Sequence, residues 1–441
     1  MDQVHIMESQ NPADSSSWLS RLLARSVLYT LLSVVIVVHW VSKLLGSLFL
    51  WLAQVTGLQS STKRRPNRLV MIGTFYNPGW FYAHVGPLIR CEQIDEVIVI
   101  TDEPVALDME NVSFQCPSPT LNARVGRMAA RLLTVLRVGW QYRPIIYMGY
   151  HVMPNSPWAL LGARLFGGKA MYQMTGGPVQ IEGGGYLSEN PLLRATGDRS
   201  KLQEQLLYAM VRCFDAVIVR GSKAQQFVRD QQLNKRCIVI TGAMDITRFS
   251  PGDAELKDFD IVYVARLVPV KGLLLFLEVV AQIKASLPSV RVAIVGDGPL
   301  YDELIKQSER LGIRDNLHFL GKLSDVIPVL RRARVYVLLS ENEGMSIAML
   351  EAMSCGLPVV ARDVGDLGDA ITGRDSGVLV EKIDRQVIAD ATLRLLTDEA
   401  QWQRQSLAAR QTIIELFSVD AITERWEKEI DAISPYYRRQ N

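Results

Sequence analysis

Two glutamates close together in the sequence, Glu343 and Glu351, are well placed to bind a polar ligand. An apolar run, 335–339, leads into a polar loop that holds Glu343. After Gly344 the pattern predicts a helix that carries Glu351 about two turns further on. Backbone N–H groups at a helix start can hold a phosphate, and carboxylates accept hydrogen bonds from hydroxyls. The segment therefore predicts a site for a nucleotide-sugar, although Glu351 could instead cap or pair on the helix surface.

Two cations follow an earlier apolar run, 259–264. Arg266 comes directly after that run, and Lys271 stands just before a predicted helix. A guanidinium binds phosphate oxygens with a planar fork, and an ammonium binds them as a point charge. The pair can therefore clamp a diphosphate, and two solvated surface cations are the alternative.

A glycine turn follows the next apolar run of this half. Gly296 and Gly298 lie in the sequence Val-Gly-Asp-Gly-Pro at 295–299. Because glycine has no side chain, such a turn lets the backbone approach a ligand closely. A further strand, loop and helix start at 359–370 supports the architecture more than the chemistry.

The elements that must position these residues alternate between apolar runs and longer helical patterns. Such alternation predicts parallel sheets covered by helices, with ligands at the carboxyl ends of the strands. The fold class is α/β, with two Rossmann-like doubly wound domains facing a cleft. The expected strands are 68–72, 96–100, 144–148, 170–174, 216–219 and 237–240, then 259–264, 291–295, 317–320, 335–339 and 358–361. The expected helices include 158–166, 201–214, 273–285, 300–311, 326–333, 347–353, 389–396, 402–416 and 419–433.

A long apolar segment, 26–58, precedes these domains and predicts membrane association. As one straight helix it would measure roughly 50 Å, well beyond a hydrocarbon core of roughly 30 Å. His39 and Lys43 lie near its middle, where ionisable groups are costly in lipid. Two interpretations stay open: two short helices that bend at 39–43 and lie in or re-enter the membrane, or one tilted helix that spans it. A core helix of a soluble protein is a third.

Basic residues flank the apolar segment on both sides, with Arg21 and Arg25 before it and a basic triplet at 63–65 after it. Basic flanks favour the cytoplasmic side of a membrane. We therefore expect a membrane-associated protein whose catalytic domains lie on the cytoplasmic face. A cleaved signal peptide is disfavoured, because the apolar stretch is too long and begins too late.

The composition excludes several other classes. The 441 residues suit two domains and an appendage, and 48% apolar and 21% charged residues are normal for a globular chain with a hydrophobic segment. A net charge of +2 gives no reason to expect nucleic-acid binding. The five cysteines are scattered without metal-like spacing, which favours a reducing compartment over a disulfide framework.

Taken together, these motifs resemble those of the retaining glycosyltransferases of family 4, which have the GT-B fold. The resemblance rests on the Arg and Lys-Gly after the first strand of the second domain, the Gly-Asp-Gly-Pro turn, the two glutamates, and the Gly-x-Pro-Val-Val-Ala strand, in that order. A stretch at 215–222 followed by 242–249 extends it into the first domain. It covers roughly 68–433 and is most specific over 261–370.

This resemblance implies a role for each matching residue. Arg266 and Lys271 would neutralise the donor diphosphate as it leaves, Glu343 would contact hydroxyls of the donor sugar, and Glu351 would hold the ribose. Gly296 and Gly298 would line the donor site. The phosphate cradle would come from the backbone N–H groups of Met345, Ser346 and Ile347. No metal and no cofactor is then expected, because the nucleotide-sugar is a substrate.

The sequence departs from the family pattern across the cleft. Thr175 stands before the Gly176-Gly177 pair, where many members have a histidine that contacts the donor sugar. Threonine can hydrogen-bond a hydroxyl but does not titrate near neutral pH. His151, at the end of the preceding strand, could face the same cleft or could have no role there.

Acceptor contacts are expected after the first strand. The stretch 73–82 is rich in aromatic and turn residues and includes Asn77, and the glycine run 181–186 could form a mobile loop. Aromatic faces stack on sugar rings and also anchor at membrane interfaces. A membrane segment makes a lipid-linked saccharide a natural acceptor, and ordinary loop packing is the alternative.

The sequence thus favours a membrane-associated retaining hexosyltransferase that moves a sugar from a nucleotide-sugar to a saccharide or lipid-linked saccharide in cell-surface polysaccharide or glycolipid synthesis. A non-catalytic GT-B binding subunit and a nucleotide-sugar 2-epimerase are the alternatives. The expected divisions are an N-terminal tail (1–25), the membrane-associated segment (26–58), a linker (59–67), the acceptor-side domain (68–250), the nucleotide-sugar domain (251–415), and a C-terminal helix that packs back on the first domain (416–441).

Overall fold

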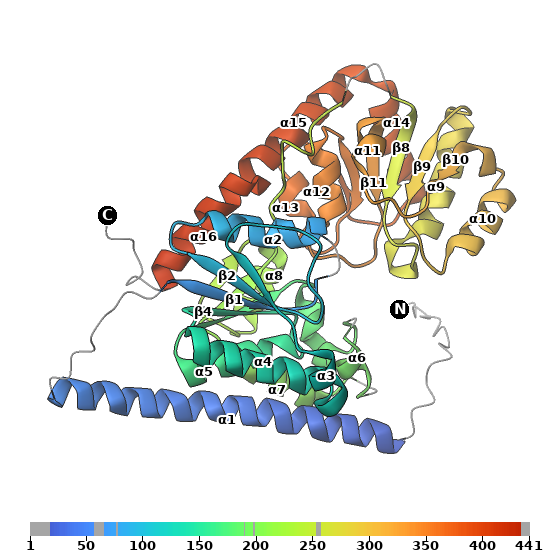
Figure 1. The fold of residues 1–441 in the computed structure, drawn as a ribbon. Coiled ribbons are helices and arrows are strands. Elements are labelled where there is room, and N and C mark those ends of the chain that lie inside the picture. The colour runs from blue at the N-terminus through green and yellow to red at the C-terminus, as the bar shows by residue number, and fades with distance from the viewer. Residues whose placement is uncertain are drawn as a thin grey trace.

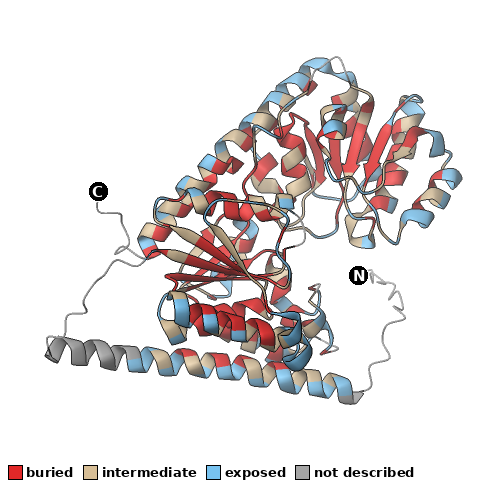
Figure 2. Cartoon of the chain, in the orientation of Figure 1, coloured by how far each residue is buried: buried red, intermediate tan, exposed pale blue. Residues whose placement is uncertain are grey.

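A computed structural model describes residues 18–56, 66–75, 78–188, 190–196, 199–252 and 257–433. These residues form two open sheets of parallel strands, one in each half of the chain, with helices packed on both faces (Figure 1). Buried residues concentrate in the strands of both sheets (Figure 2). The doubly wound α/β class expected from the sequence is confirmed.

The first sheet has the strand order β3-β2-β1-β4-β5-β6-β7. Most of its strands are continuous apolar runs, as expected when helices cover both faces. The strands are β1 (Arg68–Ile72), β2 (Glu96–Ile100), β3 (Val112–Gln115), β4 (Ile146–Tyr150), β5 (Lys169–Met174), β6 (Ala216–Val219) and β7 (Cys237–Val239). The order reverses between β1 and β4, so the ends of these two strands form a switch point where such sheets leave room for a ligand.

Two groups of helices cover this sheet. One apolar core joins the sheet to α4 (Arg127–Tyr142), α5 (Asn155–Phe166) and α7 (Lys201–Arg212). The opposite core joins it to α2 (Pro78–Arg90) and α16 (Val419–Ile433). The shorter helical segments are α3 (Pro119–Val125), α6 (Pro191–Arg194), α8 (Ser222–Asp230), η1 (Pro178–Gln180) and η2 (Glu182–Gly185).

The second sheet repeats the same plan with the order β10-β9-β8-β11-β12-β13. Its strands are β8 (Phe259–Val264), β9 (Val292–Val295), β10 (Leu317–Phe319), β11 (Ala333–Leu338), β12 (Val359–Arg362) and β13 (Gly377–Val380). Its helical segments are η3 (Pro269–Lys271), α9 (Leu273–Ser286), α10 (Tyr301–Arg310), η4 (Arg314–Asn316), α11 (Ile327–Arg331), α12 (Ile347–Ser354), α13 (Gly368–Ile371), α14 (Arg385–Thr397) and α15 (Glu399–Phe417). β8 and β11 pair in parallel and form the switch point of this sheet.

The N-terminal apolar segment forms one helix, α1 (Trp18–Thr56), of 39 residues. It lies along α5 and α7, outside the layer that those helices form on the first sheet (Figure 1). Leu28, Leu32 and Val35 are fully buried and belong to the same apolar core as α5 and α7. One stretch of α1, Ser20–Leu45, is long and apolar enough to cross a membrane by length and composition.

Of the interpretations that the sequence left open, the two short helices with a bend at 39–43 are not observed, because α1 continues through this region without a break. His39 is buried against the protein, and Arg164 Nε donates to its Nδ1 atom at 3.0 Å. A polar partner on α5 therefore satisfies the ring that was expected to interrupt the helix.

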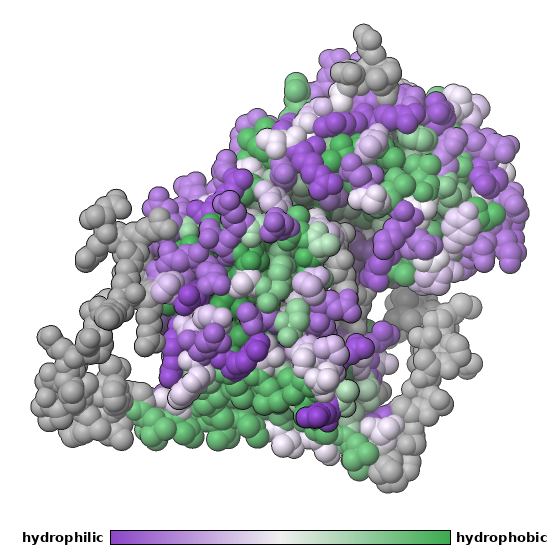
Figure 3. Space-filling view, in the orientation of Figure 1, coloured by the Kyte–Doolittle hydropathy of each residue, from purple (hydrophilic) through white to green (hydrophobic). Residues whose placement is uncertain are grey.

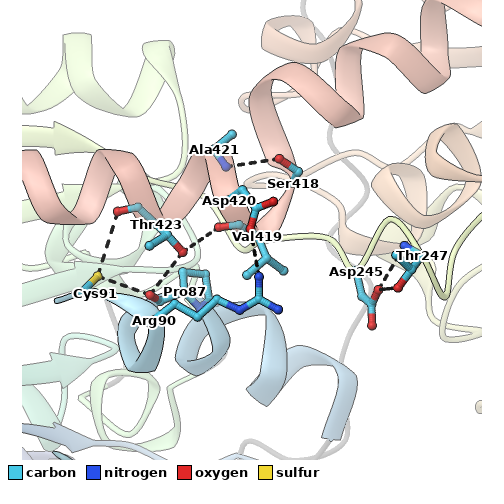
Figure 4. A network of polar contacts seen from close by, with 10 residues as sticks. All are labelled: Pro87, Arg90, Cys91, Asp245, Thr247, Ser418, Val419, Asp420, Ala421 and Thr423. Carbon is cyan, nitrogen blue, oxygen red and sulfur yellow. Dashed lines mark hydrogen bonds and ion pairs between the residues drawn. The ribbon is translucent and has the colours of Figure 1, made fainter. Parts of the chain in front are cut away.

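The chain returns to the first half at its end. α15 stops at Phe417, whose carbonyl accepts a hydrogen bond from Met244 N at 2.6 Å, and α16 then packs on α2. Arg90 pairs with Asp420 at 2.8 Å, and Thr423 Oγ1 donates to the carbonyl of Pro87 (Figure 4). The last described helix thus forms part of the core under the first sheet.

The aromatic stretch 73–82 differs from the acceptor loop that the sequence predicted. α2 begins at Pro78, where the fixed φ of proline suits a first helical residue. Phe75 and Phe81 are buried in the core, and Trp80 packs on His84 with ring centroids 4.2 Å apart. Much of this aromatic character therefore serves packing.

The glycine run also differs from the mobile loop expected there. The backbone of η2 is tied to α7, because Gln203 Nε2 donates to the carbonyl of Gly184 at 2.6 Å and Gly183 N donates to Glu204 at 2.7 Å. The two edge strands β3 and β13 were missed. In β3 none of the residues is fully buried, so that strand lacks the apolar run that marks the others.

Substitution of Trp426 tests whether α16 stabilises the first half. Its side chain is buried in the core shared with α2, so we expect Trp426→Ala to lower the free energy of unfolding by roughly 3–5 kcal/mol. The exposed Lys428→Ala on the same helix should change it by less than about 0.5 kcal/mol. Chemical denaturation measures both, and equal effects would contradict the packing role.

Candidate functional site

Lys271 and Glu343 meet at the switch point of the second sheet. Lys271 follows β8, Glu343 follows β11, and the two strands are neighbours in the sheet. Lys271 Nζ lies 2.6 Å from Glu343 Oε1. The side chains are 19% and 11% exposed, so the ion pair is largely shielded from water. Residues 72 positions apart are thus brought together where a doubly wound sheet binds its ligand.

Two hydroxyl groups fix this ion pair. Ser340 Oγ donates to Glu343 Oε1 at 2.8 Å. The Tyr263 hydroxyl, from inside β8, donates to the carbonyl of Lys271 and accepts from Leu339 N at 3.0 Å. Burial raises the pKa of Tyr263, so this hydroxyl keeps its proton and continues to donate. The sequence did not single out Tyr263, because it lies within an apolar strand.

Gly296 and Gly298 have a packing role beside this pair. Both have positive φ, +143° and +157°. A Cβ on Gly296 would stand 1.8 Å from the carbonyl oxygen of Ala265, and one on Gly298 would stand 2.5 Å from that of Leu267. The glycines therefore let this turn press against the segment that carries the exposed Arg266.

The start of α12 follows the glutamate loop directly. Ser346 caps the helix, because its Oγ accepts from Met349 N at 3.3 Å. Met345 is buried, and Ile347 is the first helical residue. The first N–H groups of a helix have no partner within it, so the three residues predicted to form a phosphate cradle lie at such a start.

Glu351 lies on α12, is partly exposed, and is near enough to Arg248 and Asp325 to sense their charges. Burial raises its pKa to about 7, the charge of Asp325 acts in the same direction, and Arg248 opposes both. In the described part of the chain, no hydrogen bond to its carboxylate is present. Glu351 is thus a shielded acceptor, as a ribose contact would require.

His151 and Thr175 are direct neighbours on the first half. Thr175 Oγ1 lies 2.8 Å from His151 Nδ1, and Gln180 Nε2 lies 3.0 Å from the same nitrogen. Tyr172 donates to Gln180 Oε1, so the Gln180 amide nitrogen faces the histidine and can only donate. His151 Nδ1 therefore accepts, and the ring proton of the neutral form lies on Nε2. Thr175 stands where a histidine was expected, and the side chain that hydrogen-bonds to Thr175 is itself a histidine, His151.

The two halves touch at these residues. The Thr175 carbonyl lies 3.0 Å from the place where a Cβ of Gly344 would stand, so the turn that begins Thr175-Gly176-Gly177 lies against the glutamate loop. The positive φ of Gly177, +73°, suits a residue without a side chain. Of the predicted site residues, Asn77 lies outside the described part of the chain.

Arg220, which the sequence did not single out, links both halves. It follows β6, and its side chain is buried. Nη2 lies 2.8 Å from His84 Nε2, and Nη1 donates to the carbonyl of Met345 at 3.4 Å. Burial lowers the pKa of Arg220 to about 10, which leaves it charged at neutral pH. The pKa of His84 is lowered by burial and then by Arg220, so His84 stays neutral and accepts. The sequence signal that could have identified Arg220 is its position directly after the apolar strand 216–219.

Acidic residues after β12 complete the contact between the halves. Asp366 Oδ1 accepts from the backbone of Lys223 and Ala224 at 3.0 and 3.1 Å, and Asp369 accepts from Ser222 N at 2.7 Å. These bonds occupy the N-terminus of α8. Gly365 allows the same loop to approach the glutamate loop, since its Cβ would stand 1.9 Å from the carbonyl oxygen of Glu343.

The arrangement can bind an anionic, hydroxyl-bearing ligand. Lys271 and Arg266 supply positive charge, Glu343 and Glu351 supply acceptors, and the start of α12 supplies N–H donors. Among the described residues there is no group of three or more His, Cys, Asp or Glu side chains placed to hold a metal ion.

Comparisons with known proteins agree with this reading of the second half. A family model described as "Glycosyl transferases group 1" matches residues 246–412. N-acetyl-alpha-D-glucosaminyl L-malate synthase of Bacillus anthracis is 33% identical over 152 residues, which are 34% of this chain and 39% of that protein. The gpi3 subunit of phosphatidylinositol N-acetylglucosaminyltransferase of Schizosaccharomyces pombe is 30% identical over 203 residues, 45% of this chain and 44% of that protein. The chain thus spans less than half the length of these relatives.

Solved structures match over most of the chain. Sucrose-phosphate synthase from Thermosynechococcus elongatus superposes with a TM-score of 0.66 at 17% identity, covering 83% of this chain and 99% of that one. Anabaena HepE in complex with UDP and glucose gives 0.65 at 18% identity, covering 83% and 100%. At these identities the likeness concerns the fold, which is GT-B.

The raised pKa of Glu351 predicts a pH-dependent stability. Between its ordinary value of 4.5 and about 7, folded protein holds a proton that the unfolded chain has lost. The free energy of unfolding therefore falls as pH rises through this window. Relative to Glu351→Gln, we expect wild-type protein to lose up to about 3 kcal/mol between pH 4.5 and pH 8. Denaturation at a series of pH values measures the difference, and parallel profiles would contradict the shift.

Proposed function

We propose that this protein is a retaining glycosyltransferase that moves a hexose-type sugar from a nucleotide-sugar to a saccharide or lipid-linked saccharide. The observation that carries the proposal is the shielded Lys271–Glu343 pair at the β8–β11 switch point. The region matched by the group 1 glycosyltransferase model contains both residues, which supports the same reaction class.

The donor side is assigned to residues 251–415. Lys271 would exchange part of its contact with Glu343 for the donor diphosphate, and Arg266 would add a second positive charge. Charge stabilisation of this kind is usually the largest catalytic contribution. These two cations would act in place of a metal. Glu351 would hold the ribose, and Glu343 would then face hydroxyls of the sugar.

The reaction would proceed on one face of the sugar. The bond between the anomeric carbon and the diphosphate oxygen breaks, and a bond from an acceptor hydroxyl oxygen to the same carbon forms. The acceptor proton passes to the leaving diphosphate. Residues 68–250 would present the acceptor, with His151 Nε2–H, held by Thr175 and Gln180, as a donor on that side.

The proposed acceptor and location are supported by α1 and by the names of two relatives. One relative is named as a phosphatidylinositol N-acetylglucosaminyltransferase subunit, and another as poly(ribitol-phosphate) alpha-N-acetylglucosaminyltransferase of Staphylococcus aureus. These names support a phosphatidylinositol lipid and a poly(ribitol-phosphate) polymer as kinds of acceptor for similar chains. We place the catalytic halves on the cytoplasmic face of a membrane, in cell-surface polysaccharide or glycolipid synthesis.

Paired variants test the proposal after a thermal-shift screen has found a stabilising nucleotide-sugar. We expect Lys271→Met and Glu343→Gln each to reduce transfer by on the order of 100-fold or more while the protein stays folded. Glu341→Gln, an exposed neighbour in the same loop, should keep wild-type activity.

The same assays separate the alternatives. Full activity in either Lys271→Met or Glu343→Gln would contradict the assigned roles. Donor binding without transfer to any acceptor would favour a binding subunit. Conversion of the nucleotide-sugar in the absence of an acceptor would favour an epimerase.

A further inference from the structure

α1 carries two apolar stripes on opposite sides. The inner stripe is Leu28, Leu32, Val35 and the buried His39, spaced four, three and four residues apart. The outer stripe repeats at similar spacing and consists of Leu23, Val27, Val34, Val37, Val41 and Leu44. At 100° per residue the two stripes are centred roughly 200° apart.

The outer stripe is open to solvent in the protein alone. Its six side chains are between 48% and 72% exposed. Figure 3 shows apolar surface over much of the described part of α1, with paler, less apolar residues between the green areas. A helix that is apolar all round belongs in a core or in lipid. Since α1 is buried against the protein on one side only, its outer side requires contact with lipid or with another apolar surface.

The inner stripe and its polar neighbours fix α1 to the first half between residues 25 and 39. Besides its buried apolar residues, Arg25 Nε donates to the carbonyl of Thr196 at 3.0 Å, and Tyr29 Oη lies 3.0 Å from Ser200 Oγ. Arg164 donates to His39 further along. A helix that crosses a bilayer would have to break these bonds and expose the core under α5 and α7.

Positive charge predominates on the helices at this side of the protein, and α7, which packs on α1, adds Lys201, Arg212 and one acid, Glu204. α1 has three Lys or Arg residues, α3 has one, α4 has three and α5 has one, and the four helices contain no Asp or Glu. Arg131 and Arg164 pair with aspartates from other segments. Against a net charge of +2 for the whole chain, this side of the protein is markedly basic. Anionic lipid headgroups complement such a surface.

Aromatic and basic residues continue beside α1. Trp140, at the end of α4, is 72% exposed and packs under the Arg143 guanidinium. Arg143 also lies over Phe166, next to the exposed Leu165 at the end of α5. Tryptophan and arginine with this exposure suit the headgroup region of a bilayer.

We propose that this face docks flat on an anionic phospholipid bilayer, with α1 in the plane of the interface and its outer stripe in the acyl boundary. The outer stripe from 23 to 44 is about 32 Å long. With α1 parallel to the membrane, the whole stripe would be buried at the same depth in the bilayer. The proposal names the surface and the mode of binding, and it depends on no step of the proposed reaction.

Vesicle flotation with the full chain tests the surface. Wild-type protein should bind preformed vesicles of phosphatidylcholine and phosphatidylglycerol, and bind pure phosphatidylcholine vesicles less. Val34→Asp combined with Val41→Asp should weaken binding at least about tenfold, because two outward apolar contacts with lipid are lost. Leu407→Asp, at a 73% exposed leucine on α15, should bind as wild type does. Equal binding by wild type and the double variant would overturn the proposal.

Two controls keep the outcome specific. The double variant should keep the wild-type melting temperature and its stabilisation by nucleotide-sugar, so that loss of docking is separated from failure of the proposed reaction. Light scattering without lipid should give the same mass for wild type and double variant. A wild-type dimer that dissociates in the double variant would show that a second copy covers the stripe, against the proposal.

The depth of residue 34 separates lying in the interface from spanning. In Val34→Trp, the fluorescence added relative to wild type should be quenched more by lipids brominated near the headgroup than by lipids brominated near the chain ends. A spanning helix puts the middle of Ser20–Leu45 near the bilayer centre, and the reverse order of quenching would overturn the in-plane mode.

Discussion

The pairing of β8 with β11 is the constraint on which the candidate site depends. Because the two strands are parallel neighbours, the segments that follow them leave the same edge of the sheet. Lys271 and Glu343 therefore meet at 2.6 Å, although the elements from α9 to β11 separate them in sequence. Lys271 and Glu343 stabilise each other's charge at a place shielded from water. A ligand that displaces Glu343 from Lys271 must therefore itself be negatively charged.

Contacts from the first half hold the glutamate loop from the opposite side. Arg220 donates to the carbonyl of Met345, and the loop around Asp366 occupies the start of α8. The chain also crosses from the second half back to the first between α15 and α16, and α16 packs on α2. The candidate site is thus shared between the halves: Lys271, Glu343 and Glu351 lie on the second half, and the network of His151, Thr175 and Gln180 lies on the first. This division explains why each half alone shows only part of the expected chemistry.

The sequence predicted what depends on local pattern. Apolar runs located most strands to within two residues, and the glutamates, Lys271 and the start of α12 lie where the strand ends required. It failed where long-range contacts decide. His39 looked costly within an apolar helix, and only its bond to Arg164 on α5 shows why α1 stays straight. The aromatics of 73–82 looked like a binding loop, but Phe75 and Phe81 are buried in the core. Arg220 bonds to Met345 and Tyr263 bonds to Leu339, and both partners lie more than 70 residues away, which no local pattern reveals.

A structure of the protein with a bound nucleoside diphosphate tests the central claim most directly. The account predicts that a phosphate oxygen contacts Lys271 Nζ, that the ribose hydroxyls contact Glu351, and that the distance between Lys271 Nζ and Glu343 Oε1 increases from 2.6 Å. A nucleotide bound elsewhere, with the Lys271–Glu343 pair unchanged, would contradict it.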